Sequence, residues 1–397
     1  RSFAARALWR LWTFAAGALV ATVVAGLAAR ALPSGTFWWA QLAAVGLPYA
    51  AAVLGLATIV PLLARRWGWT LVHLLLVGLV AWRALPGRAQ APGALGEAGP
   101  DDLVLMTFNL PTAGPSREAL GDSSVSFVRR TSPDILLMQD AWAYEPRVGP
   151  AIEQSVQVAA VEGRLPYDLR LPRNLLAGDR DGSTGVPVLI RRGAGVTVVR
   201  QDNVILADDA TASLAIRTEV RWRGRAFVLY NIHLRSFGEL KPWNDPDVQP
   251  DRPRSWVPYL RTYREVYAQR GAEAARLAER IARETLPVVI AGDFNSTADN
   301  ETVERLRTAG RPAGEPRIDA FRARGGWTWG RTYHARRPVV RIDFVLVDPA
   351  LTVVGADVAD VAFSDHRPVR AHLRWAADTT AAVTAADSTS RPASPTR

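Results

Sequence analysis

The sequence predicts an α/β protein with two packed β-sheets, preceded by a separate hydrophobic helical region. Long uncharged apolar runs of membrane-spanning length fill much of residues 1–84. From Leu103 onward, short apolar runs rich in β-branched residues alternate with polar and helical stretches. Many strands with a few interspersed helices favour a two-sheet α/β sandwich. A chain of 397 residues has room for such a domain and for an additional region.

Three transmembrane helices are expected in residues 1–84, at about 11–29, 38–63 and 67–83. The alternative is a signal peptide followed by a soluble helical hairpin. Three successive spans argue against it, and no small-residue cleavage site stands out after the first span. His73 lies in the third span and is either a functional intramembrane group or a polar group satisfied inside the helix bundle.

The positions of the arginines predict the orientation of these helices, because cytoplasmic loops carry an excess of basic residues. Three arginines precede the first span, one follows it, and a pair separates the second span from the third: Arg1, Arg6, Arg10, Arg30 and Arg65-Arg66. The N-terminus and the 65–66 loop are therefore expected in the cytoplasm. After three spans, the remainder of the chain would lie outside the cytoplasm as part of a multi-pass membrane protein.

The main domain is expected at residues 101–375, between a Gly/Pro/Ala-rich linker at 85–100 and a disordered tail at 376–397. Helices are expected at Glu118–Arg130 and Tyr263–Arg283, where apolar residues recur at helical spacing. Strands are expected at the short apolar runs Leu103–Phe108, Ile135–Met138, Val186–Ile190, Val196–Arg200, Leu214–Trp222, Ala226–Tyr230, Val288–Ala291, Arg341–Val347 and Val369–Arg374. The third and fourth of these look like a pair, and the fifth and sixth flank a hairpin turn.

Composition excludes several kinds of site. The chain has no cysteine, so it has no disulfides, thiolate metal sites or cysteine nucleophiles. Its net charge of +10 raises the question of nucleic-acid binding. Residues 1–100 hold eight arginines and one acid, whereas residues 101–375 hold 38 basic and 35 acidic residues. The main domain therefore lacks the broad basic footprint of a strong nonspecific DNA binder, although a local basic groove stays open as an alternative.

Polar residues follow the predicted strands where the strands end. The run Val288–Ala291 leads through Gly292 to Asp293 and Asn295, which share a face in extended chain. By itself this stretch could equally be a strand followed by an Asx turn. Further polar residues stand at the other strand ends, and each alone also fits a turn, a helix cap or a core histidine: Asn109, Gln139, Asp140, Asn231, His233, Asp343, Asp365 and His366. Together they supply the hard oxygen ligands and imidazoles that suit Mg²⁺ and phosphate chemistry.

This ordered set of motifs resembles the endonuclease/exonuclease/phosphatase superfamily. The resemblance spans roughly residues 103–374 and rests on Thr107-Phe108-Asn109, Gln139-Asp140, Gly185–Ile190, Asn231-Ile232-His233-Leu234, Gly292-Asp293-Phe294-Asn295, Arg341-Ile342-Asp343 and Ser364-Asp365-His366-Arg367-Pro368-Val369. The superfamily includes deoxyribonuclease I-like nucleases, neutral sphingomyelinases and inositol-polyphosphate phosphatases. The resemblance implies a four-layered α/β sandwich with the active site at one end of the two sheets.

The resemblance also implies a role for each residue. Asp293 and Asn295 would orient the attacking water and hold the phosphate, and His233 would contact the phosphate or act as an acid. His366 would be the catalytic histidine, paired with Asp343. Asp140, Asn109 and Asp365 would form the site of Mg²⁺, with Mn²⁺ as the alternative ion. The family usually has Glu where Asp140 stands, so the metal would sit closer to this strand or bind through water.

The sequence therefore predicts a membrane-anchored, Mg²⁺-dependent phosphoesterase that acts outside the cytoplasm. A domain at the outer face of a membrane meets lipid-linked phosphates and no genomic DNA, so the expected partners are the bilayer and a phosphorylated lipid. The plan also resembles bacterial membrane phosphatases linked to glycopeptide resistance, which are proposed to act on undecaprenyl pyrophosphate-type lipids. Two alternatives stay open: a tethered nuclease for extracellular DNA, and a non-catalytic sensor or scaffold with the same fold.

One aromatic segment bears on the substrate. Phe237–Tyr267 is rich in Trp, Tyr, Pro and Arg, including Trp243 and Trp256. Aromatic residues with arginines suit a membrane interface, so this segment is expected to be either a lid that meets lipid or an irregular loop that packs its own aromatics.

Overall fold

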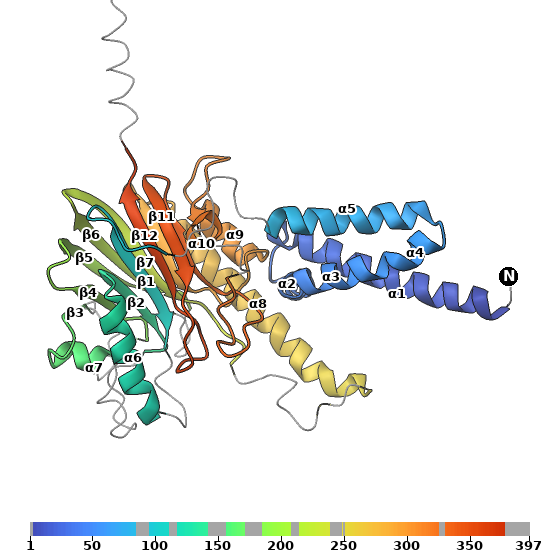
Figure 1. Ribbon diagram of the computed structural model, residues 1–397, viewed down its shortest axis with the longest axis horizontal. Helices are drawn as coiled ribbons and strands as arrows, with labels where there is room; N and C mark the ends of the chain where they lie inside the picture. The colour runs from blue at the N-terminus through green and yellow to red at the C-terminus, as the bar shows by residue number, and fades with distance from the viewer. Residues whose placement is uncertain are drawn as a thin grey trace, which may run out of the picture.

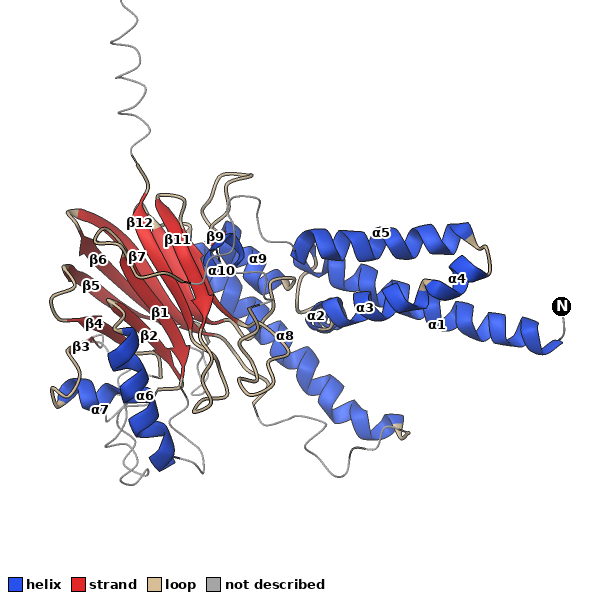
Figure 2. Cartoon of the chain, viewed as in Figure 1, coloured by secondary structure: helices blue, strands red, loops and turns tan. Residues whose placement is uncertain are grey.

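The computed structural model of the chain describes residues 3–84, 95–110, 117–141, 156–170, 185–207, 214–238, 248, 251–324 and 330–377. A helical bundle formed by the N-terminal residues stands beside a domain of two packed sheets, as Figures 1 and 2 show.

Two six-stranded sheets form the centre of the domain. The first has the order β11-β12-β1-β2-β4-β3, from Leu351–Val358, Val369–Trp375, Leu103–Asn109, Ile135–Gln139, Val188–Arg191 and Tyr167–Arg170. The second has the order β5-β6-β7-β8-β10-β9, from Val196–Ile205, Leu214–Trp222, Arg225–His233, Val288–Asp293, Asp343–Val347 and Ile318–Asp319. Both sheets are mixed, and each holds one parallel pair in the middle: β1 with β2, and β7 with β8.

Helices cover the outer faces of both sheets, which confirms the predicted four-layered sandwich. Apolar residues of α6 (Arg117–Thr131) and α7 (Val156–Val161) pack on the first sheet. Those of α8 (Pro253–Ile281) and α9 (Glu301–Thr308) pack on the second. A third cluster fills the space between the sheets. Alternate residues of β1 pack in different layers of the domain. Leu105 lies between the two sheets, whereas Met106 lies under α6 and α7. Strands buried on both faces are apolar on both, which is why they read as continuous runs in the sequence.

Two sequence predictions about this domain are wrong. The runs at 186–190 and 196–200 do not pair, because β4 pairs with β2 and β3 whereas β5 pairs with β6 in the other sheet. The glycine-containing turn between them carries the chain across the core instead of closing a hairpin. Helix α8 begins at Pro253, ten residues before the predicted start, since proline is well suited to the first turn of a helix. The second half of the aromatic segment is therefore helical and not irregular, while Trp243 lies outside the described residues.

The bundle consists of α1 (Phe3–Ala28), a short turn η1 (Ala29–Ala31), α2 (Trp38–Val45), α3 (Leu47–Ala57), α4 (Ile59–Leu63) and α5 (Trp67–Ala84). Within the described residues, α1 and α5 are long and apolar enough to cross a membrane. Residues 38–63 do not form the single straight helix that the sequence predicts. A bend of 70° separates α2 from the following helix. These helices form a third possible membrane span only if the bent pair is counted as one span. Gly46 and Pro48 lie at the bend, where proline cannot donate a backbone hydrogen bond.

His73 is enclosed by the bundle. Its side chain is fully buried, and its Nδ1 lies 3.4 Å from the Thr58 hydroxyl. Trp12 and Trp69 lie against the imidazole ring. These contacts favour the interpretation of His73 as a polar group held inside the helix bundle over that of a functional intramembrane group.

The bundle packs directly on the domain. Gln41 of α2 is fully buried, and its Oε1 accepts hydrogen bonds from Asn300 Nδ2 at 3.1 Å and from the backbone N–H of Glu301 at 3.0 Å. The Ser34 hydroxyl donates to Glu301 Oε2 at 2.8 Å, and Arg30 pairs with Asp299 at 2.7 Å. Buried polar contacts of this kind hold two units in a defined arrangement, since leaving one partner unpaired costs more than the bond contributes.

A buried ion pair supports the second sheet, and breaking it has a predicted cost. Arg341 donates two hydrogen bonds to Asp319, at 2.8 and 2.5 Å, and the two side chains are only 12% and 10% exposed. We expect Asp319→Asn to lower the free energy of unfolding by about 3–5 kcal/mol, because it leaves Arg341 buried without its counter-charge. Urea denaturation measures this change. Asp168→Asn is the control, because its ion pair with Arg192 is exposed and is expected to contribute less than about 1 kcal/mol.

The same pair predicts a dependence of stability on pH. Burial by itself would raise the pKa of Asp319, but Arg341 outweighs burial and holds this pKa below its usual value. The stabilisation is therefore fully present above about pH 4 and is lost as pH falls through the lower pKa of the folded state. Asp319→Asn should accordingly unfold with a shallower acid dependence than the wild type. Equal acid dependence of the two proteins would contradict this account of the pair.

Candidate active site

The two central parallel pairs bring the polar strand ends together. Asn109 and Gln139 lie side by side where β1 and β2 end, and His233 lies beside Asp293 where β7 and β8 end. A hydrogen bond of 3.0 Å from Asn109 Nδ2 to Asp293 Oδ2 joins the two sheets at this point. Because both parallel pairs end at the same edge of the sandwich, residues far apart in the sequence meet in one site.

Gly292 permits the close approach of β7 and β8. Its φ is +142°, and a Cβ at this position would lie 2.0 Å from the carbonyl oxygen of Ile232 on β7. Only glycine fits a backbone of this kind without strain. This glycine lies one residue before Asp293 and therefore sets the distance between Asp293 and His233.

We expect Gly292→Ala to destabilise the fold by about 3 kcal/mol or more, because it combines backbone strain with a collision against a carbonyl group. Thermal unfolding measures this effect. Gly224→Ala is the matched control, since Gly224 also has positive φ (+77°) but has no atom within 4 Å of the added Cβ. A Gly292→Ala variant no less stable than Gly224→Ala would show that the collision is relieved at little cost.

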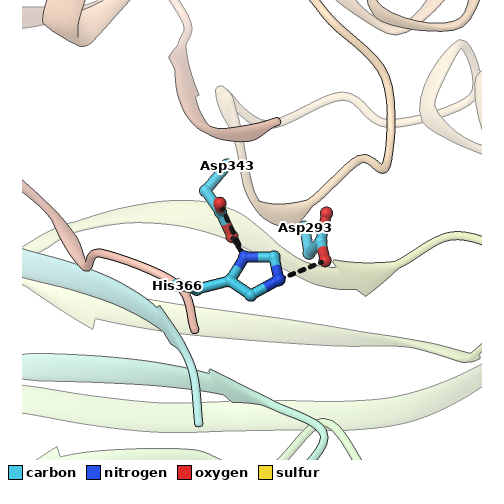
Figure 3. Close-up of side chains that lie close together, drawn as sticks. All are labelled: Asp293, Asp343 and His366. Carbon is cyan, nitrogen blue, oxygen red and sulfur yellow. Dashed lines mark hydrogen bonds and ion pairs between the residues drawn. The ribbon is translucent and has the colours of Figure 1, made fainter. Parts of the chain in front are cut away.

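Asp293, His366 and Asp343 form a line of three buried side chains (Figure 3). His366 Nδ1 lies 3.0 Å from Asp343 Oδ2, and the opposite ring nitrogen, Nε2, lies 3.8 Å from Asp293 Oδ2. Asp343 therefore accepts from the Nδ1–H group and orients the imidazole so that Nε2 faces Asp293.

A second imidazole reaches the same carboxylate. His233 Nε2 lies 3.7 Å from Asp293 Oδ2, and His233 Nδ1 lies 3.5 Å from Asp140 Oδ1. Asp140 is 43% exposed on its side chain and has a positive φ of 52°. The structure thus brings Asp140 to the open side of the site, beside His233.

The charges in this cluster shift one another. Burial and the nearby charge of Asp343 raise the pKa of Asp293 to about 6, against the opposing effect of His366 and His233. Burial by itself would lower the pKa of His366, but Asp343 and Asp293 outweigh burial and raise it to about 10. At neutral pH His366 is therefore an imidazolium held between two carboxylates.

Asn295 and Asp365 occupy the loops that follow the site. Asn295 has φ of +48° and its backbone N–H donates to Asp293 Oδ1 at 2.8 Å, so the Asx turn that the sequence offered as an alternative is present and holds the Asp293 carboxylate. The Asn295 amide donates to the Leu234 carbonyl at 2.9 Å and ties this turn to the loop after His233. Asp365 precedes His366, and its Oδ1 is buried without a hydrogen-bond partner.

Asn109 and Asp365 carry oxygens of the kind that a hard divalent cation prefers. Asn109 Oδ1 and Asp365 Oδ1 are both buried oxygens without a hydrogen-bond partner. The Ser364 hydroxyl donates to the Asn109 carbonyl at 2.9 Å, which brings the two loops together. Unpaired buried oxygens are costly unless a ligand completes them, and Mg²⁺ prefers carboxylate and carbonyl oxygens. Among the described residues, Asp293, Asp343 and His366 also hold ligand atoms within 4.8 Å of one another. Since the Asp343–His366 hydrogen bond already uses Nδ1, we interpret these three residues as a group that accepts and donates protons, and not as metal ligands.

Four further residues support the site, and the sequence by itself assigns a role to none of them. Gln139 Nε2 donates to Asn231 Oδ1 at 2.6 Å, and the Asn231 amide donates to the Met138 carbonyl at 2.9 Å, which links β2 to β7 beneath the site. The backbone N–H of His366 donates to the Ser364 hydroxyl at 3.1 Å. The ring of Tyr333 lies 4.9 Å from the His366 ring. The sequence already marked Gln139 and Asn231 as polar residues at the ends of apolar strands, but gave them no role.

Several solved structures have a similar fold. A mannosyl-6-phosphatase of Bacteroides thetaiotaomicron VPI-5482 is 16% identical, with a TM-score of 0.46 over 69% of this chain and 100% of that chain. The human Nocturnin catalytic domain is 16% identical, with a TM-score of 0.45 over 70% and 97% of the two chains. A humanized D. rerio TDP2 is 15% identical, with a TM-score of 0.45 over 69% and 99%. No curated protein matches this chain by sequence.

A family model covers most of the domain that carries the site. The match extends over residues 106–366, from within β1 to His366, and so includes Asn109, Asp293 and Asp343. With two sheets between layers of helices and polar strand ends gathered at one edge, the chain belongs to the Endonuclease/Exonuclease/phosphatase family.

Proposed function

We propose that this chain is a membrane-anchored, divalent-cation-dependent phosphoesterase that acts on a lipid-linked phosphate or pyrophosphate outside the cytoplasm. The observation that carries the proposal is the contact between the apolar bundle and the segment that directly follows Asp293 and Asn295. Asn300 and Glu301 form hydrogen bonds with Gln41 and Ser34 of the bundle. Along the chain, they follow Asp293 and Asn295 within eight residues. A site held this close to membrane-spanning helices is suited to a substrate that is itself anchored in the bilayer.

Different residues of the site carry out different steps of phosphoester hydrolysis. Asp293, fixed by Asn109 and by the Asn295 backbone, is placed to align a water molecule and to accept its proton. The raised pKa of His366 favours Asp293 over His366 as this base. His366, as an imidazolium oriented by Asp343, donates to the phosphoryl or leaving oxygen, and His233 faces the same space.

A divalent cation fits the remaining donors. Asn109, Asp140 and Asp365 would hold Mg²⁺, or Mn²⁺ in its place. When bound, the ion neutralises phosphate charge and stabilises the leaving oxygen.

The arrangement of the bundle supports a catalytic domain outside the cytoplasm. The guanidinium of Arg66 lies 5.3 Å from the centre of the Trp9 ring, so the Arg65-Arg66 loop packs beside the first half of α1. Both lie at the end of the bundle away from the domain (Figure 1). Basic residues gathered at that end are expected on the cytoplasmic side, which puts the domain on the opposite side.

The test is an assay of the full chain, reconstituted in bilayers with Mg²⁺, on undecaprenyl pyrophosphate, sphingomyelin and plasmid DNA. We expect phosphate release from the lipid pyrophosphate, loss of that activity with a chelator, and recovery on adding Mg²⁺ or Mn²⁺. Asp293→Ala is the inactive control. Nicking of plasmid without hydrolysis of either lipid would replace this proposal with a tethered nuclease. Inactivity on all three substrates would favour a non-catalytic scaffold.

A further inference from the structure

An apolar groove lies in the bundle, between α1 and the bend that joins α2 to α3. Its volume is about 520 Å³. Residues from both sides line it, including Ala21, Ala25, Trp39, Leu42, Ala43 and Gly46. Thr22 and Trp39 are the lining residues whose side chains carry a polar group, and the Thr22 hydroxyl already donates to the Ala18 carbonyl of its own helix at 3.0 Å. The groove is therefore mostly apolar and suits a hydrocarbon.

The groove lies at the end of the bundle that faces the domain. Ala25 and Ala21 stand three and seven residues before Ala28, where α1 ends. At about 1.5 Å per residue, they lie roughly 5 and 10 Å below that end of the span. The ion pairs of Arg30 and Arg83 with Asp299 mark the same end. A chain in this groove would thus occupy the part of the bilayer nearest the catalytic domain.

The same bent segment contacts both catalytic loops. Gln41, next to groove residue Leu42, hydrogen-bonds Asn300 and Glu301 in the loop after Asn295. Tyr49, next to groove residue Ala50, donates a hydrogen bond to the Val339 carbonyl. Its ring also lies 5.4 Å from the Arg331 guanidinium. The loop between Arg331 and Val339 carries Tyr333, whose ring lies against His366. The bend therefore has the groove on the bundle side and the two site loops on the domain side.

From these contacts we propose that the groove binds the hydrocarbon chain of the lipid substrate close to its phosphate end, and that the α2–α3 bend aligns that chain with the site. This inference rests on the proposed function and adds the substrate class, a phosphate ester with a long apolar chain. A single chain is the occupant that fits. A helix with side chains is about 10–12 Å across, so this volume holds little more than roughly one turn of a partner helix.

Filling the groove tests the proposal. Ala21→Phe and Ala43→Phe place a ring in the groove from α1 and from α2, and Ala52→Phe places the same ring on an exposed part of α3 as the control. Activity is measured on undecaprenyl pyrophosphate and on a short-chain, water-soluble pyrophosphate ester. We expect each groove variant to lower the ratio of kcat/KM for the long chain to that for the short chain by about tenfold or more. Displacing two buried methylene groups is enough for that change. A ratio equal to that of Ala52→Phe would overturn the proposal.

A binding measurement separates this proposal from the proposed function. A polyprenyl pyrophosphate with a photoreactive chain is cross-linked to the full-length Asp293→Asn protein, and the labelled peptides are identified by mass spectrometry. Labelling concentrated at Trp39 and Leu42, and reduced by adding Ala21→Phe, supports the groove even if the wild type hydrolyses no lipid. Labelling spread evenly over the exposed faces of α1 and α5 would refute it, as would cross-linking of groove residues to a second copy of the chain.

Discussion

Replacing Asp293 with asparagine is expected to lower kcat/KM for phosphoester hydrolysis by roughly 10²–10⁴-fold, the range measured when a general base is removed. The carboxylate is the one group that both imidazoles face, with His233 Nε2 at 3.7 Å and His366 Nε2 at 3.8 Å from the same oxygen. An asparagine side chain of the same shape keeps one oxygen, which accepts from either Asn109 Nδ2 or the Asn295 backbone N–H, because these two donors bond to different oxygens of Asp293. It cannot, however, accept the proton of the attacking water.

Asp357→Asn is the matched control for this substitution. Asp357 pairs with Arg370 and lies in the edge strand β11, not at the site. The Asp357→Asn variant should unfold within about 1 kcal/mol of the wild type, since a partly exposed ion pair contributes little. Thermal unfolding of Asp293→Asn is measured beside it, because Asp293 is buried. If Asp293→Asn kept more than about a tenth of wild-type activity, Asp293 would not be the base.

The second large effect is expected at His366 and Asp343, and the two residues should act as one unit. His366→Gln and Asp343→Asn should each lower kcat by roughly 10²-fold or more. If Asp343 acts on the substrate through His366, the double variant should be no worse than His366→Gln alone. The three variants and the wild type are compared in a double-mutant cycle. Additive losses would mean that Asp343 acts by a separate route.

The pH profile distinguishes a positioning role of Asp343 from a structural one. Asp343 is a main cause of the raised pKa of His366, about 10 against a usual value of about 6.5. If the protonated imidazole is the active form, activity of the wild type is lost as pH rises through this raised pKa. In Asp343→Asn the loss should occur at lower pH, because one of the two carboxylates that stabilise the imidazolium is gone. An unshifted alkaline limb would argue that Asp343 only supports the fold.

The apolar helical bundle docks on the domain through specific buried contacts. The residues that dock it, Gln41 and Asn300, are both fully or almost fully buried and hydrogen-bonded to each other. Residues 95–100 of the predicted linker are described, while 85–94 lie outside the described residues, as does the predicted tail from 378 onward. The residues that make this contact lie outside the linker.

Much of the fold could be predicted from the chain itself, because the relevant forces are local. Runs such as Val288–Ile290 are apolar on every residue because both faces of their strands are buried. The β6–β7 hairpin follows from turn residues next to two apolar runs. The long apolar helices α1 and α5 follow from length and composition.

The polar strand ends could be predicted as a set, and the family resemblance also implied the pairing of His366 with Asp343. Asp293 and Asp343 were recognisable because each is an acidic residue at one end of an apolar strand. The buried oxygens of Asn109 and Asp365 that lack a hydrogen-bond partner depend on how separate loops meet. Backbone register, and not sequence spacing, decides those contacts.

The sequence by itself determined which strands are apolar on both faces, where the backbone needs glycine, and which side chains can carry phosphate chemistry. Only the tertiary structure decided that β5 joins the second sheet, that the second apolar run bends at Gly46, and that Gln41 lies against Asn300. The place of β5 and the contact of Gln41 with Asn300 have the same physical reason. These features depend on contacts between segments tens to hundreds of residues apart, whose free energy exists only once the sheets and the bundle have packed.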